Sequence, residues 1–139
     1  MRGLVPVTIA TKSGAKLIKA ELADTTPEQA AGLMFRTALA DDAGMLFYPY
    51  PPEGGPPQPA SFWMENTPLP LDILFIRADG TIARIAADTV PMSQTPIESG
   101  EPVGAVLEIR GGRAAAMGIA EGDRVTLPPH AVAGGGGAG

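Results

Sequence analysis

Five side chains of the types that build polar sites stand within otherwise apolar segments: Arg36, Trp63, Glu65, Asp72 and Glu108. Asp72 and Glu108 each interrupt an apolar run that is typical of a buried strand. Burying a lone charge costs several kcal/mol, so each acid must be paired, protonated or functional. Trp63, the only tryptophan, and Glu65 lie in the same stretch as Asp72, Ser61–Phe75. We therefore regard these five residues as the candidate binding site.

Two non-catalytic uses of these residues are compatible with the sequence. In the first, Arg36 compensates one or two of the carboxylates in a structural network of ion pairs or hydrogen bonds. In the second, the polar groups anchor a small molecule in an apolar pocket at one end of a barrel. The aromatic walls of that pocket would be Tyr48, Phe62, Trp63 and Phe75.

Catalysis is a third use of the same residues. Paired acids serve as general acid and general base when their environments separate their pKa values. The chain offers no Ser–His, Cys–His or glycine-elbow arrangement that would support nucleophilic catalysis. We expect a non-enzymatic protein, and the alternative is a small hydrolase or isomerase that uses paired carboxylates.

Two sets of potential metal ligands occur in the sequence. The oxygen ligands of a hard cation such as calcium would be Glu65, Asp72 and Glu108, but their spacing matches no loop motif. The sulfur ligands of a soft ion such as Cu(I) would be Met34, Met45, Met64 and Met92. Three of these methionines lie among core-like residues, where methionine commonly fills gaps. We predict no metal site and no cofactor, and keep metal binding as an alternative.

The bulk composition suits one globular domain. The chain has 139 residues, of which 45% are apolar, and a formal net charge of -5. No apolar run approaches the length of a membrane span, and the absence of a basic stripe argues against nucleic acid as a partner. Cysteine is absent, which excludes disulfides and a cysteine nucleophile and leaves the compartment open. The single histidine, His130, lies beyond the last expected strand, without partners for a metal or a triad.

Alternation of apolar and polar residues predicts many short strands. The expected strands are Val5–Ala10, Lys16–Ala23, Met45–Tyr48, Leu71–Ile76, Thr81–Ala86, Val103–Ile109 and Arg124–Leu127. A short helix is predicted over Pro27–Met34, because Thr25 or Thr26 can cap it and Pro27 suits its first turn. A second helical turn is predicted over Arg113–Met117 and ends at Gly118.

Proline and glycine mark two long loops, Pro49–Pro59 and Pro91–Pro102. The first loop could be an inert insertion, a lid over a site or a docking segment for a partner. The sequence has neither an internal repeat nor a βαβ rhythm. The expected fold is mainly β, bordering on α+β: a compact barrel-like antiparallel or mixed sheet with one short helix packed across it.

We expect a single β-barrel-like domain over residues 4–128 and a disordered Gly/Ala tail over residues 129–139. The tail cannot bury enough surface to offset the entropy of ordering it. The first residues run directly into an alternating segment and show no pattern of a secretory leader. A cytoplasmic protein and the mature form of an exported one are both compatible with this start.

Several fragments resemble a known family when they are taken in chain order. They are Gly32–Arg36, Gly44–Phe47, Phe62–Thr67, Leu71–Phe75 and Val106–Ile109, followed by Gly112, Gly118-Ile119 and Gly122-Asp123. Together they look like the family called domain of unknown function 192, over roughly Ala20–Leu127. The loop Pro49–Pro59 is longer than the family pattern. Members are small bacterial or archaeal proteins, many with a secretory leader, so the resemblance implies a periplasmic or secreted protein. The family has no established biochemical activity.

The sequence therefore predicts an exported accessory domain that binds a small molecule or a protein in a polar-anchored aromatic pocket. Neither nucleic acid nor a membrane is an expected partner. We expect Arg36, Trp63, Asp72 and Glu108 to converge near one end of the barrel.

Overall fold

The structure, a computed structural model, describes residues 3–128, which form nine strands and two short helices. The elements are β1 (Val5–Thr11), β2 (Gly14–Ala23), α1 (Thr26–Ala31), β3 (Ala43–Phe47), β4 (Gln58–Phe62), β5 (Leu71–Ile76), β6 (Ile82–Ala86), β7 (Ile97–Val103), β8 (Ala105–Arg110), α2 (Arg113–Met117) and β9 (Arg124–Thr126). Neither helix has the length and apolar character needed to cross a membrane. The predicted mainly β class is confirmed. The predicted tail and His130 lie outside the described residues.

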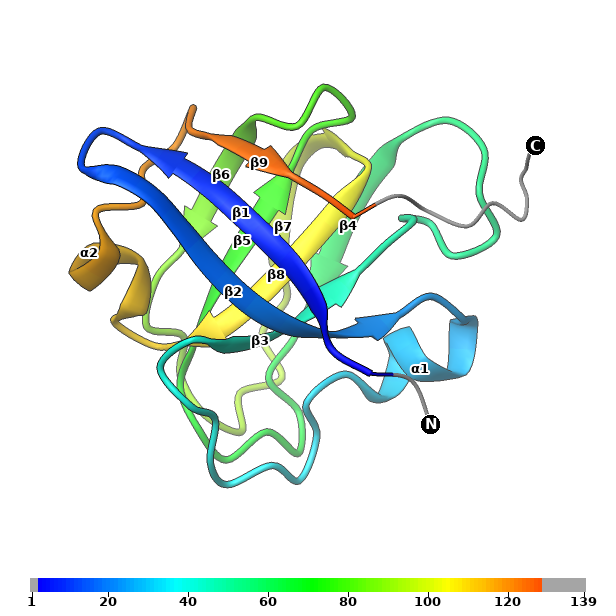
Figure 1. Ribbon diagram of the computed structural model, residues 1–139. Coiled ribbons are helices and arrows are strands. Elements are labelled where there is room, and N and C mark those ends of the chain that lie inside the picture. The colour runs from blue at the N-terminus through cyan, green and yellow to red at the C-terminus, as the bar shows by residue number, and fades with distance from the viewer. Residues whose placement is uncertain (1–2, 129–139) are drawn as a thin grey trace.

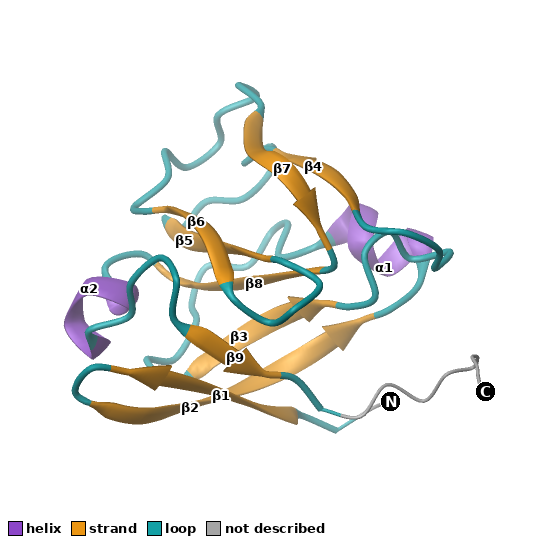
Figure 2. Ribbon diagram, turned by 90° about the horizontal axis from the view of Figure 1, so that it is seen from above, coloured by secondary structure: helices purple, strands orange, loops and turns teal. Residues whose placement is uncertain are grey.

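Seven strands form one mixed sheet that curls into a nearly closed barrel (Figure 1). The strand order is β6-β5-β8-β3-β2-β1-β9. The two edge strands approach each other, since Thr81 and Arg124 form an isolated bridge and the Val125 N–H donates to the Gly80 carbonyl at 2.7 Å. The other two strands, β4 and β7, pair as a separate ribbon above β5 and β8 (Figure 2).

The segment β2-α1-β3 contains the parallel pair of the sheet and is a βαβ unit, which was not predicted from the sequence. Its helix begins with reciprocal capping: Thr25 Oγ1 accepts from the Glu28 N–H at 3.2 Å, and Glu28 Oε1 accepts from the Asp24 N–H at 3.1 Å. The helix ends at Ala31, three residues earlier than predicted. Gly32 has a φ of 49° and turns the chain back toward the sheet.

Both predicted proline-rich loops contain strand residues. β4 takes the end of the first loop, and β7 takes the second half of the other. Pro59 and Pro102 lie opposite each other in the two-stranded ribbon. Each strand of the ribbon has one unpaired edge. Proline is tolerated at such an edge because its missing N–H costs no hydrogen bond between strands.

Two apolar layers lie on opposite faces of the sheet. The largest side chains of the layer inside the barrel are Ile9, Ile18, Leu46, Leu74, Ile76, Ile82 and Leu107. The outer layer packs between the sheet and the β4–β7 ribbon, and its largest members are Phe47, Met64, Leu71, Ile73 and Phe75. The central strands β5 and β8 are therefore buried on both faces, which explains their continuous apolar sequences.

Asp72, on β5, faces the inner layer at the α2 end of the barrel and is 1% exposed. Its Oδ1 accepts from the backbone N–H groups of Asp88 at 2.8 Å and Gly112 at 3.1 Å. Its Oδ2 accepts from the N–H of Ala114 at 2.8 Å. The carboxylate thus caps the start of α2 from a distant strand and ties the segment after β6 to the same point.

We predict that Asp72→Asn lowers the free energy of unfolding by about 2–3 kcal/mol, because the new amide N–H₂ faces the Ala114 N–H and leaves a buried donor unpaired. Denaturant unfolding monitored by tryptophan fluorescence measures this change. The control is Asp42→Asn, whose side chain is 57% exposed and 3.8 Å from Lys19 Nζ. The control should change stability by less than about 0.5 kcal/mol. Equal stability of the two variants would contradict a structural role for Asp72.

Candidate functional site

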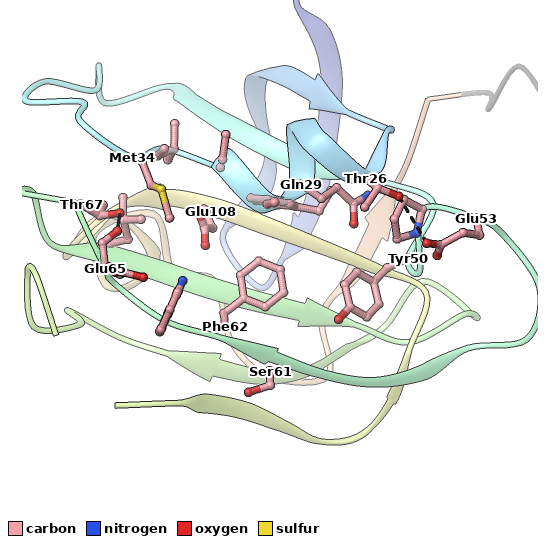
Figure 3. Close-up of a pocket in the computed structure, with 18 residues that line it drawn as sticks. Thr26, Gln29, Met34, Tyr50, Glu53, Ser61, Phe62, Glu65, Thr67 and Glu108 are labelled. Carbon is pink, nitrogen blue, oxygen red and sulfur yellow. Dashed lines mark hydrogen bonds between the residues drawn. The ribbon is translucent and has the colours of Figure 1, made fainter. Parts of the chain in front are cut away.

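A cavity of about 330 Å³ lies between α1, the outer face of the sheet and the loop that precedes β4 (Figure 3). Its lining comes from Thr26, residues 29–34, Phe47, Tyr50, Pro52, Glu53, residues 61–63, Glu65, Thr67, Leu71 and Glu108. The cavity therefore joins residues from all five of the longer fragments noted in the sequence, with the largest shares from Gly32–Arg36 and Phe62–Thr67, although these fragments lie on different elements. It lies beside α1 on the outer face of the sheet, and α2 lies on the other side of the molecule from α1 (Figures 1 and 2).

Glu108 is the buried acid of this cavity. It lies on β8 opposite Met45 of β3 and Ile73 of β5, so it belongs to the outer layer. The residue is 4% exposed, and within residues 3–128 neither a hydrogen bond nor a neighbouring charge contributes to the pKa of its carboxyl group. Burial alone raises the pKa of Glu108 from the ordinary 4.5 to about 8. The carboxyl group is therefore largely protonated at neutral pH in the free protein.

The surroundings of Glu108 are mostly apolar. In Figure 3 its carboxyl group lies between Met34 and Phe62, with Glu65 across the cavity. Three of the five predicted site residues, Trp63, Glu65 and Glu108, thus line one cavity. Trp63 is 47% exposed, which places it at the entrance.

Gln29, on α1, is a second polar group of the cavity wall and was missed from the sequence. Its Nε2 donates to the carbonyl of Ala23 at 2.9 Å and to that of Pro49 at 2.8 Å. Two carbonyl acceptors fix the orientation of the amide. Its Oε1 is buried and has no hydrogen-bond partner among the described residues. A glutamine in the first turn of a helix is so common that nothing in the sequence marks this one.

Aromatic rings form the other walls. Phe62 packs edge-on against Phe47, with ring centres 5.0 Å apart at 87°, and against Phe75, at 5.9 Å and 77°. Tyr50 lies 6.0 Å from Phe62, and burial raises the pKa of its hydroxyl group. Such edge-to-face packing holds the rings in fixed positions.

Of the four aromatic residues predicted to form the walls, Phe62 and Trp63 line this cavity, whereas Tyr48 and Phe75 do not. Tyr48 packs against the inner layer, because it follows Phe47 and neighbours along a strand alternate between faces. Phe75 is fully buried behind Phe62.

Asp72 does not join Glu108, and the predicted convergence of these two acids is wrong. Across β5 and β8, Asp72 pairs with Ile109, whereas Glu108 pairs with Ile73. Paired residues share a face and successive residues alternate, so the two carboxyl groups point to opposite faces of the sheet. The oxygens of Asp72 are already occupied by backbone N–H groups.

Arg36 is also outside the cavity, and its predicted pairing with the candidate carboxylates is wrong. It forms a two-pronged contact with Glu21 of β2, Nη1 to Oε2 at 2.8 Å and Nη2 to Oε1 at 2.6 Å. These hydrogen bonds raise the pKa of Arg36 and lower that of Glu21. Both side chains are 40% exposed. Arg36 therefore fastens the turn after α1, which lines the cavity, to the barrel wall.

The remaining charged groups of the cavity are acidic. Glu65 Oε2 accepts from Gln94 Nε2 at 3.4 Å, and Glu53 Oε2 accepts from Thr26 Oγ1 at 3.3 Å. Lysine, arginine and histidine are absent from the lining within the described part of the chain. Its walls therefore carry negative or neutral groups only.

The oxygen ligands considered for a hard cation are not assembled within residues 3–128, where no three His, Cys, Asp or Glu side chains form a group. Asp72 lies on the other face of the sheet from Glu108. Of the methionines, Met45 and Met64 are buried, whereas Met92 is 55% exposed. The thioether of Met64 accepts a hydrogen bond from Thr89 Oγ1 at 3.1 Å.

A second, more open depression of about 620 Å³ is lined by residues 37–40, Leu69, Pro70, Arg110 and Gly111. Its charged residue, Arg110, is paired with Asp41. This depression offers no unpartnered buried polar group among the described residues, and we take the cavity at Glu108 as the candidate site.

Comparison with known proteins gives a family and two similar crystal structures. A protein of unknown function from Novosphingobium aromaticivorans DSM 12444 is 48% identical, with a TM-score of 0.83 over 89% of this chain and 85% of that one. A protein from Sinorhizobium meliloti 1021, described as a proposed transcription regulator, is 39% identical, with a TM-score of 0.81 over 91% of this chain and 97% of that one. A search of curated proteins gives no match. The family described as Uncharacterized ACR, domain of unknown function 192, matches residues 7–127, and this chain belongs to that family.

Proposed function

We propose that this protein binds a small organic molecule in the cavity at Glu108 and carries out no reaction on it. The observation that supports the proposal is the Glu108 carboxyl group, which is 4% exposed, lines an open cavity and has no partner among the described residues. Buried polar atoms in native proteins are nearly always hydrogen-bonded, and Gln29 Oε1, which belongs to the same cavity, is buried without a partner among the described residues. A ligand that hydrogen-bonds to both Glu108 and Gln29 accounts for these two groups.

The size and composition of the cavity suit this use. A volume of about 330 Å³ is at the lower end of the range for small-molecule sites, and most such sites are apolar with a few converging polar groups. The aromatic rings of Phe47, Tyr50 and Phe62 supply the apolar walls. Glu108 and Gln29 supply the polar groups.

The alternative of an enzyme with paired carboxylates is less well supported. General acid–base catalysis by two acids needs both groups within reach of one substrate. Asp72 points to the opposite face of the sheet from Glu108, and its oxygens already accept three backbone hydrogen bonds. The proposed pair is therefore not assembled.

Two other functions are also less well supported. The loop before β4 contributes Tyr50, Pro52 and Glu53 to the cavity wall, which favours a role in the site over an independent docking segment. Transcription regulation, which the description of the Sinorhizobium relative names, would call for a basic surface if it acted through DNA, whereas this chain has a net charge of -5.

Blocking the cavity tests the proposal. We predict that some member of a panel of metabolite-sized compounds raises the melting temperature of the wild-type protein and does not raise that of Ala30→Trp. Ala30 is an exposed residue of α1 that lines the cavity, so an indole there would fill its entrance. The matched control is Ala116→Trp, at an exposed alanine of α2 at the other end of the barrel. A silent panel, or a shift that survives in Ala30→Trp, would count against ligand binding in this cavity.

The raised pKa of Glu108 predicts how stability depends on pH. Its pKa is about 8 in the folded protein and 4.5 at its ordinary value, so the folded state binds this proton more tightly than the unfolded state. The stability that it contributes is fully present below pH 4.5 and is lost as pH rises toward 8. The loss amounts to about 1.4 kcal/mol per pH unit inside this window.

Glu108→Gln removes this titration. Between about pH 5.5 and about pH 7.5, the wild-type protein should lose roughly 2–3 kcal/mol of unfolding free energy relative to Glu108→Gln. Urea unfolding at a series of pH values measures the difference, and every other group that titrates cancels in the comparison. Parallel pH profiles of the two proteins would show that Glu108 is not held protonated by burial.

A further inference from the structure

We infer that the ligand is an organic cation with N–H donors, a primary ammonium or a guanidinium-type group on a small apolar body. This inference rests on the proposed binding function and names the chemical class of its ligand. Three features of the cavity lead to it: the sign of its charged groups, the hydrogen-bonding capacity that its walls leave unused, and its aromatic composition.

The charged groups of the lining select against anions. Glu53, Glu65 and Glu108 all line the cavity, and no cationic side chain of the described chain accompanies them. A carboxylate or phosphate ligand would enter without a counter-charge, would face the acidic side chains of Glu53 and Glu65, and would keep Glu108 from ionising. Placing like charges together in a partly buried site costs several kcal/mol, which favours a neutral or cationic ligand.

The hydrogen-bonding groups that the cavity walls leave unused are acceptors, so the ligand must supply the donors. Gln29 Oε1 is a pure acceptor, since both carbonyl contacts of this amide are made by Nε2. The Glu108 carboxyl group, once ionised, is likewise an acceptor only. Hydrogen bonds from a charged N–H to a carboxylate are roughly twice as strong as neutral ones. An ammonium or guanidinium group therefore satisfies Glu108 in a way that a neutral hydroxyl group does not.

The aromatic residues fit the rest of such a molecule. Tyr50, Phe62 and Trp63 line the same space, and aromatic faces attract cations within about 6 Å of the ring centre. A quaternary ammonium group would use the rings and leave Glu108 without a donor. The N–H groups of the ligand are therefore the part that the site selects.

Binding of such a cation is coupled to a proton. Glu108 is largely protonated near pH 7, and a cation beside it favours the ionised form. The proton leaves to solvent as the ligand binds. The positive charge of the ligand then balances the negative charge of ionised Glu108. The other titratable groups that line the cavity are Tyr50, Glu53 and Glu65. Comparing the wild-type protein with Glu108→Gln shows whether the released proton comes from Glu108.

Probes that share one aromatic ring test the inference by isothermal titration calorimetry on the full chain. They are benzylamine and benzamidine as N–H cations, benzyltrimethylammonium as a cation without N–H groups, benzyl alcohol as a neutral donor and benzoate as an anion. We expect the two N–H cations to bind with a Kd at least about tenfold lower than the other three, which corresponds to about 1.4 kcal/mol. Titrations in two buffers of different ionisation enthalpy should show release of nearly one proton per ligand at pH 7.

Substitutions assign the effect to Glu108. Glu108→Gln should weaken binding of benzylamine at least about tenfold and abolish proton release. Glu98→Gln, at an exposed position of β7 outside the cavity, is the matched control and should change neither. Unchanged proton release in Glu108→Gln would overturn the inference.

The same probes separate this inference from the proposed function. Tighter binding of benzyl alcohol, benzoate or benzyltrimethylammonium that is lost in Ala30→Trp would overturn the cationic class and leave a binding cavity in place. Failure of all five probes would also overturn the inference. The function itself would then be judged by whether any compound of the wider panel stabilises the wild-type protein and not Ala30→Trp.

Discussion

Burial of β5 and β8 on both faces is the constraint on which this structure depends. The barrel interior covers one face, and the β4–β7 ribbon with the turn after α1 covers the other. A strand of this kind can carry an ionisable residue only if the fold provides for it, because neither face is open to bulk water except where a cavity reaches it. Each of the two strands carries one acid, and the two acids are accommodated in opposite ways.

Asp72 is satisfied by the protein itself. Three backbone N–H groups from segments that follow it by 16 to 42 residues converge on its oxygens, so it acts as a structural joint at the α2 end. Glu108 is buried to a similar degree, 4% exposed against 1% for Asp72, and has no such donors among the described residues; it borders a cavity on the opposite face of the sheet. We attribute the first acid to folding and the second to binding, since a protein that needed only stability would have an apolar side chain at position 108.

The sequence predicted those features that depend on local pattern. The continuous apolar run of β5 has the predicted bounds, and the capped start of α1 follows from Thr25, Pro27 and Glu28. β7 was missed because Gly100 and Pro102 interrupt it, and an edge ribbon tolerates both. Long-range contacts could not be predicted. Backbone N–H groups carry no signature in the sequence, so the partners of Asp72 were invisible. Glu108 and Trp63 were identified because a buried acid and a lone tryptophan are rare, whereas Gln29 is ordinary in type and position.

The central claim is that Glu108 is a buried carboxyl group without a partner in the free protein. The most direct test is a pH titration of its side-chain carboxyl carbon by NMR, with the resonance assigned by its loss in Glu108→Gln. The account predicts a midpoint near the value of about 8 that burial imposes. A midpoint near the ordinary 4.5 would mean that water or an unseen partner solvates the ionised group, and it would contradict the account.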